Sequence, residues 1–285
     1  NAASGTVSSA TTTTLTDSSK TFASVGNGTY YVAIVQGPGA GQLRKVVSNT
    51  TNTLTIDTQW EVVPNSSCNY ALAQVSVDWL IKGNSLNQVP RGIWMYTTGM
   101  QRTSIVKNTL TDAEGIYLRT DYRVPPSSLP RFNVQMDAYI ANNTVKNPLA
   151  WYLAYIASVA NDINVTNNLG TQHFGIEARN NLIENSGNGL DQGYLPAGTA
   201  YWSKALNYLS SQGSNQNDPS RAESTKVILG TIFQGNTVTN LTGGNLTNAF
   251  SIGTGTYYDV IWNSTVSNVP ILVSDATGVG TTHAS

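Results

Sequence analysis

Apolar and β-branched residues occur along the whole chain in short runs that are separated by Gly, Asn, Asp and Pro. Such runs predict strands joined by turns. In the early part of the chain the predicted strands are Tyr30–Val35, Leu43–Val47 and Thr53–Asp57. Helical periodicity is confined to Tyr201–Leu209, where we expect about two helical turns. The pattern therefore predicts an all-β protein with a β-rich N-terminal unit over residues 1–75.

From residue 76 a degenerate repeat begins, in which a short strand ends on an asparagine at a turn. The repeated residues are Asn84, Asn108, Asn143, Asn181 and Asn236, with Ser264 in the last copy, and they are separated by 24 to 55 residues. Asn tolerates the left-handed conformation that a tight turn requires. If successive coils stack at ~4.8 Å, equivalent residues form columns and their amides can bond from coil to coil. The repeat therefore predicts a parallel β-helix over residues 76–285 with an asparagine ladder.

A second strand is expected after each repeated asparagine. The predicted segments are Gly92–Tyr96, Gly115–Arg119, Ala150–Ala154, Ala249–Gly253 and Pro270–Ser274. Because the shortest separation already accommodates one coil, the longer separations indicate loops inserted between strands. The largest insertions are predicted near residues 122–131 and 186–223.

The coil pattern of residues 76–275 resembles the pectate-lyase-like superfamily of right-handed parallel β-helix proteins. The resemblance rests on the repeat and its asparagines, without a catalytic signature. It implies a secreted protein related to polysaccharide lyases, glycoside hydrolases, epimerases or phage tailspikes. A fold of this kind does not select among those activities.

The composition narrows the class of ligand. Charged residues make up 11% of the chain and the net charge is -1, whereas charged residues are ~25% of a typical globular domain. A strong electrostatic attraction to nucleic acid or to an anionic membrane is excluded. No apolar run reaches the ~18 residues that a membrane span needs. The many hydroxyl and amide side chains favour an extracellular protein whose partner is a polysaccharide or oligosaccharide.

Few residues are available for metal or redox chemistry. Cys68 is the sole cysteine, so an internal disulfide or a cysteine-based zinc site is excluded. His173 and His283 lie far apart in the sequence and form no recognisable triad. We predict no cofactor, and a Ca²⁺ ion held by scattered Asp residues is an alternative without a supporting motif. The open ends of a coil and the start at Asn1 favour a homo-oligomer or a larger parent chain.

Strand alternation divides the predicted coil into inward and outward positions. On the strand after each asparagine, the outward residues are Trp94, Tyr96, Tyr117, Arg119, Asp121 and Tyr152. The aromatic members predict a column on which sugar rings stack; the alternative is that a loop or another subunit covers it. On the strand before the asparagine, Glu177 and Arg179 point outward, with a structural ion pair as the alternative; Glu177 shares its column with Tyr139, and Arg179 shares its column with Ala141 and Gln234. Asp78, Arg102 and Asp137 form a further outward column that we interpret as structural.

Three carboxylates are candidate catalytic residues. Asp121 follows the aromatic strand, Asp191 opens the long insertion near the same column, and Glu177 lies on the preceding strand. Glycosidases use a pair of carboxylates to protonate the leaving group and to attack or activate water. The main hypothesis is therefore a glycoside hydrolase acting on a largely neutral glycan. The alternatives are a non-catalytic cell-surface, tailspike or filament protein and a uronate polysaccharide lyase, for which Arg119, Arg123 and Arg179 are the candidates to bind the substrate.

Overall fold

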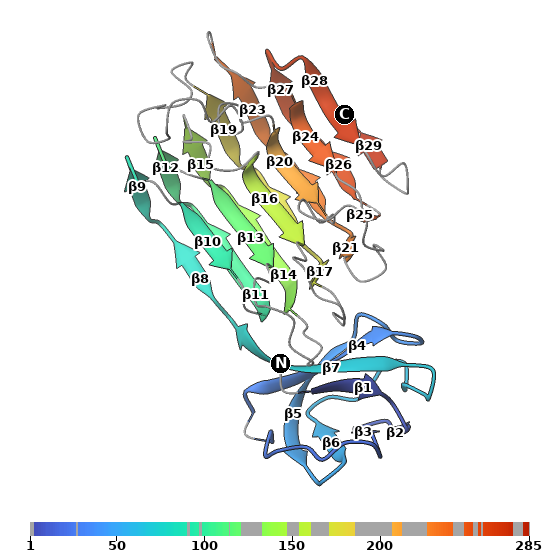
Figure 1. Ribbon diagram of the computed structural model, residues 1–285. Helices are drawn as coiled ribbons and strands as arrows, with labels where there is room; N and C mark the ends of the chain where they lie inside the picture. The colour runs from blue at the N-terminus through green and yellow to red at the C-terminus, as the bar shows by residue number, and fades with distance from the viewer. Residues whose placement is uncertain are drawn as a thin grey trace, which may run out of the picture.

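The structure is a computed structural model, and it describes residues 3–26, 28–89, 92–96, 99–113, 115–120, 133–146, 154–160, 171–185, 207–212, 227–241, 248–252, 256–257, 259–275 and 282–284. These residues form strands, turns and loops and contain no α-helix. Figure 1 shows a small group of strands at one end of the molecule and a long stack of strands beyond it. The predicted all-β class with parallel sheets is confirmed for the described residues.

The N-terminal group is antiparallel. Its strands are β1 (Ala3–Thr6), β2 (Ser9–Thr11), β3 (Thr14–Thr16), β4 (Tyr30–Gln36), β5 (Leu43–Asn49), β6 (Thr53–Ile56) and β7 (Asn69–Val77). β7 pairs with β1 and β4, while β5, β6, β3 and β2 follow each other edge to edge. The three strands predicted here are confirmed within two residues at each end. Buried Leu15, Ile34, Leu54 and Leu72 fill the space between the strands.

A buried carboxylate lies inside this N-terminal group. The side chain of Asp17 is 1% exposed, and its two oxygens accept hydrogen bonds from the Tyr70 hydroxyl at 2.8 Å and the Ser19 hydroxyl at 2.6 Å. The Ser19 backbone N–H also donates to Asp17, at 3.0 Å. Burial, followed by the hydrogen bond to Asp17, raises the pKa of Tyr70 well above its ordinary value. The cluster joins β7 to the turn after β3, so it fixes two segments distant in sequence.

Beyond β7 the chain passes through three parallel sheets in turn, coil after coil. The first sheet contains β8 (Leu80–Lys82), β11 (Gly99–Val106), β14 (Asn133–Ala141), β17 (Thr171–Phe174), β18 (Glu177–Arg179), β21 (Val227–Leu229), β22 (Ile232–Gln234), β25 (Thr256–Tyr257), β26 (Val260–Trp262) and β29 (Thr282–Ala284). The second contains β9 (Ser85–Asn87), β12 (Thr109–Thr111), β15 (Thr144–Lys146), β19 (Leu182–Asn185), β23 (Thr237–Asn240) and β27 (Thr265–Ser267). The third contains β10 (Ile93–Tyr96), β13 (Ile116–Thr120), β16 (Ala154–Ala160), β20 (Asn207–Gln212), β24 (Asn248–Ile252) and β28 (Ile271–Asp275). The described strands thus follow a β-helix-like path.

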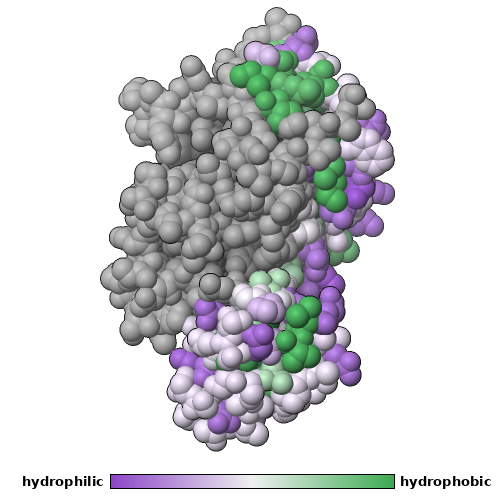
Figure 2. All heavy atoms as spheres, turned by 90° about the vertical axis from the view of Figure 1, so that its right-hand side faces the viewer, coloured by the Kyte–Doolittle hydropathy of each residue, from purple (hydrophilic) through white to green (hydrophobic). Residues whose placement is uncertain are grey.

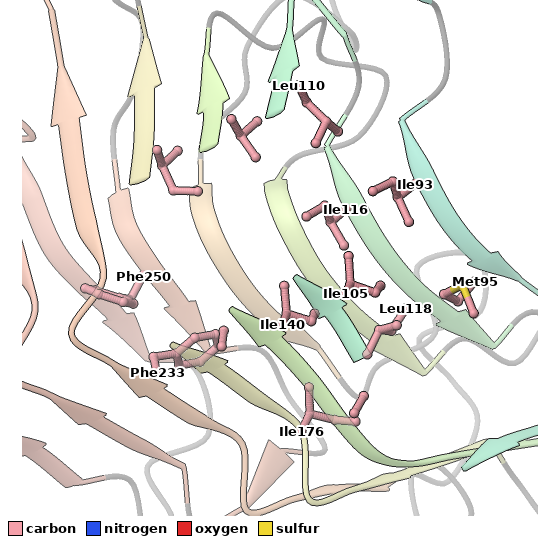
Figure 3. Close-up of a cluster of buried hydrophobic side chains, with 14 of the residues drawn as sticks. Ile93, Met95, Ile105, Leu110, Ile116, Leu118, Ile140, Ile176, Phe233 and Phe250 are labelled. Atoms are coloured by element: carbon pink, nitrogen blue, oxygen red, sulfur yellow. The ribbon is translucent and has the colours of Figure 1, made fainter. Parts of the chain in front are cut away.

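Apolar side chains fill the interior between the three sheets in columns that run along the stack (Figure 3). The first sheet contributes Ile105, Ile140, Ala178, Phe233 and Ile261, which are paired in register from strand to strand. Each of these residues is at most 5% exposed. Since an inward side chain covers its neighbours above and below, each coil protects the next one from water.

The predicted asparagine ladder is confirmed. The Asn108 backbone N–H and side-chain amide both donate to Asn143 Oδ1, at 2.9 and 3.0 Å. The Asn143 amide in turn donates to Asn181 Oδ1 at 3.0 Å and to the Ile105 carbonyl at 2.8 Å. The same bonds join Asn84 to Asn108 and Asn181 to Asn236, and the Asn236 N–H donates to Ser264 Oγ at 3.2 Å. Buried amides are thus hydrogen-bonded through the whole described stack, as burial requires.

The left-handed turn conformation is found one residue earlier than the sequence predicts. At the ladder turns the residues with positive φ are Gly83, Lys107, Asn142, Asn180, Gly235 and Asn263, each directly before a ladder residue. The assignment of this conformation to the ladder asparagines was therefore wrong. The residue before each ladder residue bends the chain from the first sheet into the second. This bend points the following Asn side chain into the interior, where it bonds to the adjacent coils.

Two strands of the third sheet also differ from the sequence prediction. The strand predicted at Ala150–Ala154 is β16, at Ala154–Ala160. β20, at Asn207–Gln212, lies inside the range predicted as one insertion, 186–223, and its first residues overlap the predicted helix Tyr201–Leu209. That helix prediction was wrong for residues 207–209. β20 pairs in parallel with β16 and β24, so this coil has its own third-sheet strand.

The charged column predicted from the sequence lies where the N-terminal group meets the stack. β7 pairs antiparallel with β4 but parallel with β11, so it belongs to both parts. Arg102 Nε lies 2.7 Å from Asp78 Oδ1, and the neighbouring Gln101 amide lies 3.4 Å from Asp137. The hydrogen bond from Arg102 holds the pKa of Asp78 below its ordinary value. The ion pair is more than half exposed on both sides, so it orients the junction more than it stabilises it.

Candidate functional site

Polar and aromatic side chains gather on the outer face of the first sheet, on β14, β18, β22 and β26. Inward Ile140, Ala178, Phe233 and Ile261 are buried on these four strands. Because side chains alternate along a strand, the residues on either side of each inward one point outward. Of these neighbouring residues, Ala141 is buried, and Ile232 and Val260 are apolar and partly exposed. The polar and aromatic ones define the candidate site, and they are Tyr139, Glu177, Arg179, Gln234 and Trp262. We call this set the outer strip.

A hydrogen-bonded cluster occupies the middle of the outer strip. Arg179 Nε donates to Glu177 Oε2 at 2.7 Å, and Arg179 Nη1 donates to Gln234 Oε1 on the neighbouring strand. The Glu177 and Arg179 side chains are 36% and 30% exposed. The cluster is therefore held in one arrangement by its internal bonds, while part of its polar surface faces solvent and is available to a ligand's hydroxyl groups.

An exposed aromatic residue lies on each side of this cluster. Tyr139 is 38% exposed and is paired in register with Glu177. Trp262 is 50% exposed and is paired in register with Gln234. An aromatic ring on a rigid strand offers a flat apolar surface at low entropic cost. The C–H faces of sugar rings pack on such surfaces, and their hydroxyl groups bond to polar neighbours.

The aromatic column predicted on the third sheet is only partly described. Trp94 pairs with Tyr117 and Tyr96 pairs with Arg119, as the sequence predicts. In the next strand Tyr117 pairs with Ala157, so the predicted alignment of Tyr117 with Tyr152 was wrong. The positions that continue this column are Ala157, Ser210, Ser251 and Ser274. The register of β16 thus replaces the third aromatic residue of the column by a small one.

Several candidate residues lie outside the described part of the chain. Asp121, Asp191 and Tyr152 are outside the described residues, as are the side chains of Tyr96, Tyr117 and Arg119. Among the predicted catalytic residues, Glu177 is described, and its carboxylate is paired with Arg179. The alternative weighed for Glu177 and Arg179, a structural ion pair, matches this geometry.

Tyr139, Gln234 and Trp262 were not predicted as site residues. The predicted columns nevertheless align Tyr139 with Glu177 and Gln234 with Arg179, and the strand register confirms both alignments. Trp262 lies at the same spacing before its ladder residue as Gln234, so it continues the column of Arg179. The repeat therefore contained the signal that brings these residues together.

Exposed apolar side chains also occur away from the outer strip. They include Ile271 and Leu272 on β28, and Val62 and Val63 in the N-terminal group. Figure 2 shows apolar surface on both the stack and the N-terminal group in this view. Among the described residues, no group of three or more His, Cys, Asp and Glu side chains is placed to hold a metal ion. A helix long and apolar enough to cross a bilayer is also absent from the described residues.

Comparison with known proteins gives structural neighbours only. No family model and no curated protein matches the chain. The tailspike gp61 of Pseudomonas phage phi297 is 13% identical, with a TM-score of 0.33 over 95% of this chain and 57% of that one. The tailspike gp49 of Pseudomonas phage LKA1 is 12% identical, with a TM-score of 0.28 over 99% of this chain and 66% of that one. The chain therefore spans less than two thirds of either tailspike.

Proposed function

We propose that this chain is an extracellular right-handed parallel β-helix protein that binds a largely neutral polysaccharide on the outer strip, with residues 1–75 as a separate β-rich unit. The observation that carries the proposal is the cluster of Glu177, Arg179 and Gln234 between two exposed aromatic rings. This combination matches the two surfaces of a sugar, because the rings accept C–H faces and the cluster accepts hydroxyl groups.

The charge balance of the strip supports a neutral ligand. The Arg179 guanidinium is matched by the Glu177 carboxylate at 2.7 Å. An acidic polysaccharide would have to compete with Glu177 for this cation. The net charge of -1 supplies no wider positive field that would attract a polyanion.

Binding is the function that we propose, with hydrolysis as a separate activity to be measured. A glycosidase needs two carboxylates at a defined separation. Glu177 would be one of them, and its pairing with Arg179 favours a positioned hydrogen-bonding group over a general acid. The non-catalytic surface or tailspike-type alternative is therefore preferred to the hydrolase and lyase hypotheses.

The test is a polysaccharide array probed with the wild-type protein and with single variants. We expect retention of neutral polysaccharides and a loss of about tenfold in affinity for Tyr139→Ala or Trp262→Ala. A smaller loss is expected for Tyr139→Phe, which keeps the ring, and for Trp262→Phe, which keeps an aromatic surface of smaller area. Leu272→Ala is the matched control, because it removes an exposed apolar side chain from another sheet. Retention that is equal in all variants would contradict the assignment of the strip.

Hydrolysis is measured on the same polysaccharides by the release of reducing ends. If the wild type releases them and Glu177→Gln, a near-isosteric change, abolishes the release without loss of binding, the hydrolase hypothesis replaces the binding proposal. No release with wild-type binding intact supports the proposal as stated.

A further inference from the structure

A serine takes the place of asparagine at the last position of the ladder, Ser264. We infer that residues 259–275, the coil of β26, β27 and β28, open as a unit while the coils before them stay folded, and that Ser264 determines this opening. The opening needs no ligand, so it is independent of the proposed function. It makes one end of the stack a conformational element of its own.

Three hydrogen bonds connect each pair of successive ladder asparagines. The Asn181 backbone N–H and side-chain amide both donate to Asn236 Oδ1 at 3.0 Å, and the Asn236 amide donates back to the Ala178 carbonyl at 2.8 Å. The same three bonds, with lengths of 2.8 to 3.0 Å, join the earlier pairs, which are Asn84–Asn108, Asn108–Asn143 and Asn143–Asn181. The ladder therefore holds these coils together with the same set of bonds at each step.

The last pair of ladder residues keeps one of these three bonds. The Asn236 backbone N–H donates to Ser264 Oγ at 3.2 Å, which is longer than the corresponding bonds between asparagines. Serine has no amide to donate back, and the Ser264 hydroxyl donates to the Trp262 carbonyl of its own coil at 3.3 Å. Because each buried hydrogen bond contributes to stability, the loss of two of them weakens the attachment of residues 259–275 to the stack.

Side-chain packing does not replace the missing bonds. Val266 and Val273 point inward but are partly buried, whereas their register partners in the preceding coil, Val238 and Phe250, are fully buried. Other apolar side chains of this coil are about half exposed, and they are Trp262, Ile271 and Leu272. The coil buries less apolar surface than an interior coil does, so fewer contacts resist its opening.

The first coil of the stack, formed by β8, β9 and β10, separates the effect of the ladder from that of exposure. Its inward Ile81 and Leu86 are also partly buried. Asn84 nevertheless makes both of its bonds to Asn108, and the Asn108 amide donates back to the Ile81 carbonyl. The first coil thus has exposed apolar residues with a complete set of ladder bonds. Local opening is therefore expected in residues 259–275 and not in the first coil.

The opening unit carries one end of the outer strip. Trp262 lies on β26 and is paired in register with Gln234 on β22. When β26 separates from β22, the Trp262 ring moves away from the cluster of Glu177, Arg179 and Gln234. Ser264 thereby determines how rigidly this end of the strip is held.

Hydrogen exchange of the full chain without ligand, followed by mass spectrometry, tests the inference. In the wild type, peptides from residues 259–275 should exchange about tenfold faster than peptides from the first coil. Ser264→Asn makes the turn Asn263–Thr265 identical in sequence to Asn142–Thr144. It should restore the missing bonds and slow exchange in residues 259–275 by about tenfold, with no change in peptides that carry Asn108.

Thr265→Asn is the matched control, because it places the same amide on the next residue, which is exposed and outside the ladder. It should leave exchange unchanged, whereas Ser264→Ala, which removes the remaining bond, should make residues 259–275 exchange about fivefold faster. Equal exchange in the first and last coils of the wild type would overturn the inference. So would a slowing by Ser264→Asn that is the same in all peptides, or an equal slowing by Thr265→Asn.

Discussion

The N-terminal group and the parallel stack bury polar groups in two different ways. In the N-terminal group a single carboxylate, Asp17, collects hydrogen bonds from Tyr70 and Ser19, and nothing in the described residues repeats this arrangement. In the stack the same amide bond recurs from Asn84 to Asn236. The hydrogen-bonding groups of a unique cluster find their partners only when segments distant in sequence come together. In the ladder, each coil supplies the partners for the next coil.

This difference predicts how far the structural effect of a substitution extends from its site. A ladder residue contacts two coils, so removing it damages the stack above and below. A change in the N-terminal cluster should remain within the strands that converge on Asp17. Substitutions at Asn143, at Gly37 and Gly83, and at Tyr70 compare the two regions.

The largest effect is expected for Asn143→Ala. Asn143 is 1% exposed, and its loss removes the acceptor of the Asn108 backbone N–H and side-chain amide and the side-chain donor to the Ile105 carbonyl, while the backbone N–H of residue 143 still donates to Asn181 Oδ1. We expect the free energy of unfolding to fall by about 4 kcal/mol, because several buried groups lose hydrogen bonds together. Urea unfolding followed by circular dichroism measures the loss. The control is Asn142→Gly, at the exposed neighbour with positive φ. Equal losses in the two variants would show that the ladder hydrogen bonds of Asn143 do not stabilise the fold.

The next effect compares two glycines with positive φ. Gly37, in the N-terminal group, has φ of 87°, and a Cβ there would meet backbone and side-chain atoms of Ser67 and Cys68 at 2.8 to 3.0 Å. Gly83, in the stack, has φ of 69° with no atom within 4 Å of such a Cβ. We expect Gly37→Ala to lower stability by about 3 kcal/mol, from strain and overpacking, and Gly83→Ala by about 1 kcal/mol, from strain alone. Thermal unfolding of both variants measures the two losses of stability. A larger loss for Gly83→Ala would contradict the role given to overpacking at Gly37.

A loss between those of Gly37→Ala and Gly83→Ala is expected for Tyr70→Phe, which keeps the ring and removes the hydroxyl that donates to Asp17 at 2.8 Å. We expect a loss of about 2 kcal/mol, typical of a hydrogen bond to a carboxylate. Hydrogen exchange should rise in peptides from the N-terminal strands and stay unchanged in peptides that carry Asn108 and Asn143. Faster exchange in the ladder as well would show that the two regions unfold as one unit.

The same variant tests a pH dependence. Burial raises the pKa of Tyr70 above its ordinary value of 10.0, so the folded state resists deprotonation more than the unfolded state does. The contribution of Tyr70 to stability is therefore complete below about pH 10 and decreases as the pH rises above it. Wild-type protein should lose N-terminal protection above about pH 10 more steeply than Tyr70→Phe. Parallel profiles for the two proteins would assign the alkaline loss to other groups.

The two regions also differ in what the sequence predicts. The ladder was predictable because one residue type recurs at one turn, so a single rule applied at each repeat. The register of β16 was not predictable, since residues 150–160 are apolar at both alternating sets of positions. The pairing of β7 with β1 joins segments that are distant in sequence and leaves no local pattern. At the candidate site, the outward orientation of Glu177 and Arg179 and the alignment of Tyr139 with Glu177 were predicted, whereas the contribution of Trp262 was not.

The separations between ladder residues have a consequence for how such a protein changes over time. They range from 24 to 55 residues, yet the amide bonds across them have nearly the same length, 2.9 and 3.0 Å. Insertions between ladder residues therefore leave the hydrogen-bond geometry of the ladder unchanged. Natural selection can therefore change the length of the segments between ladder residues while the ladder residues keep their hydrogen bonds.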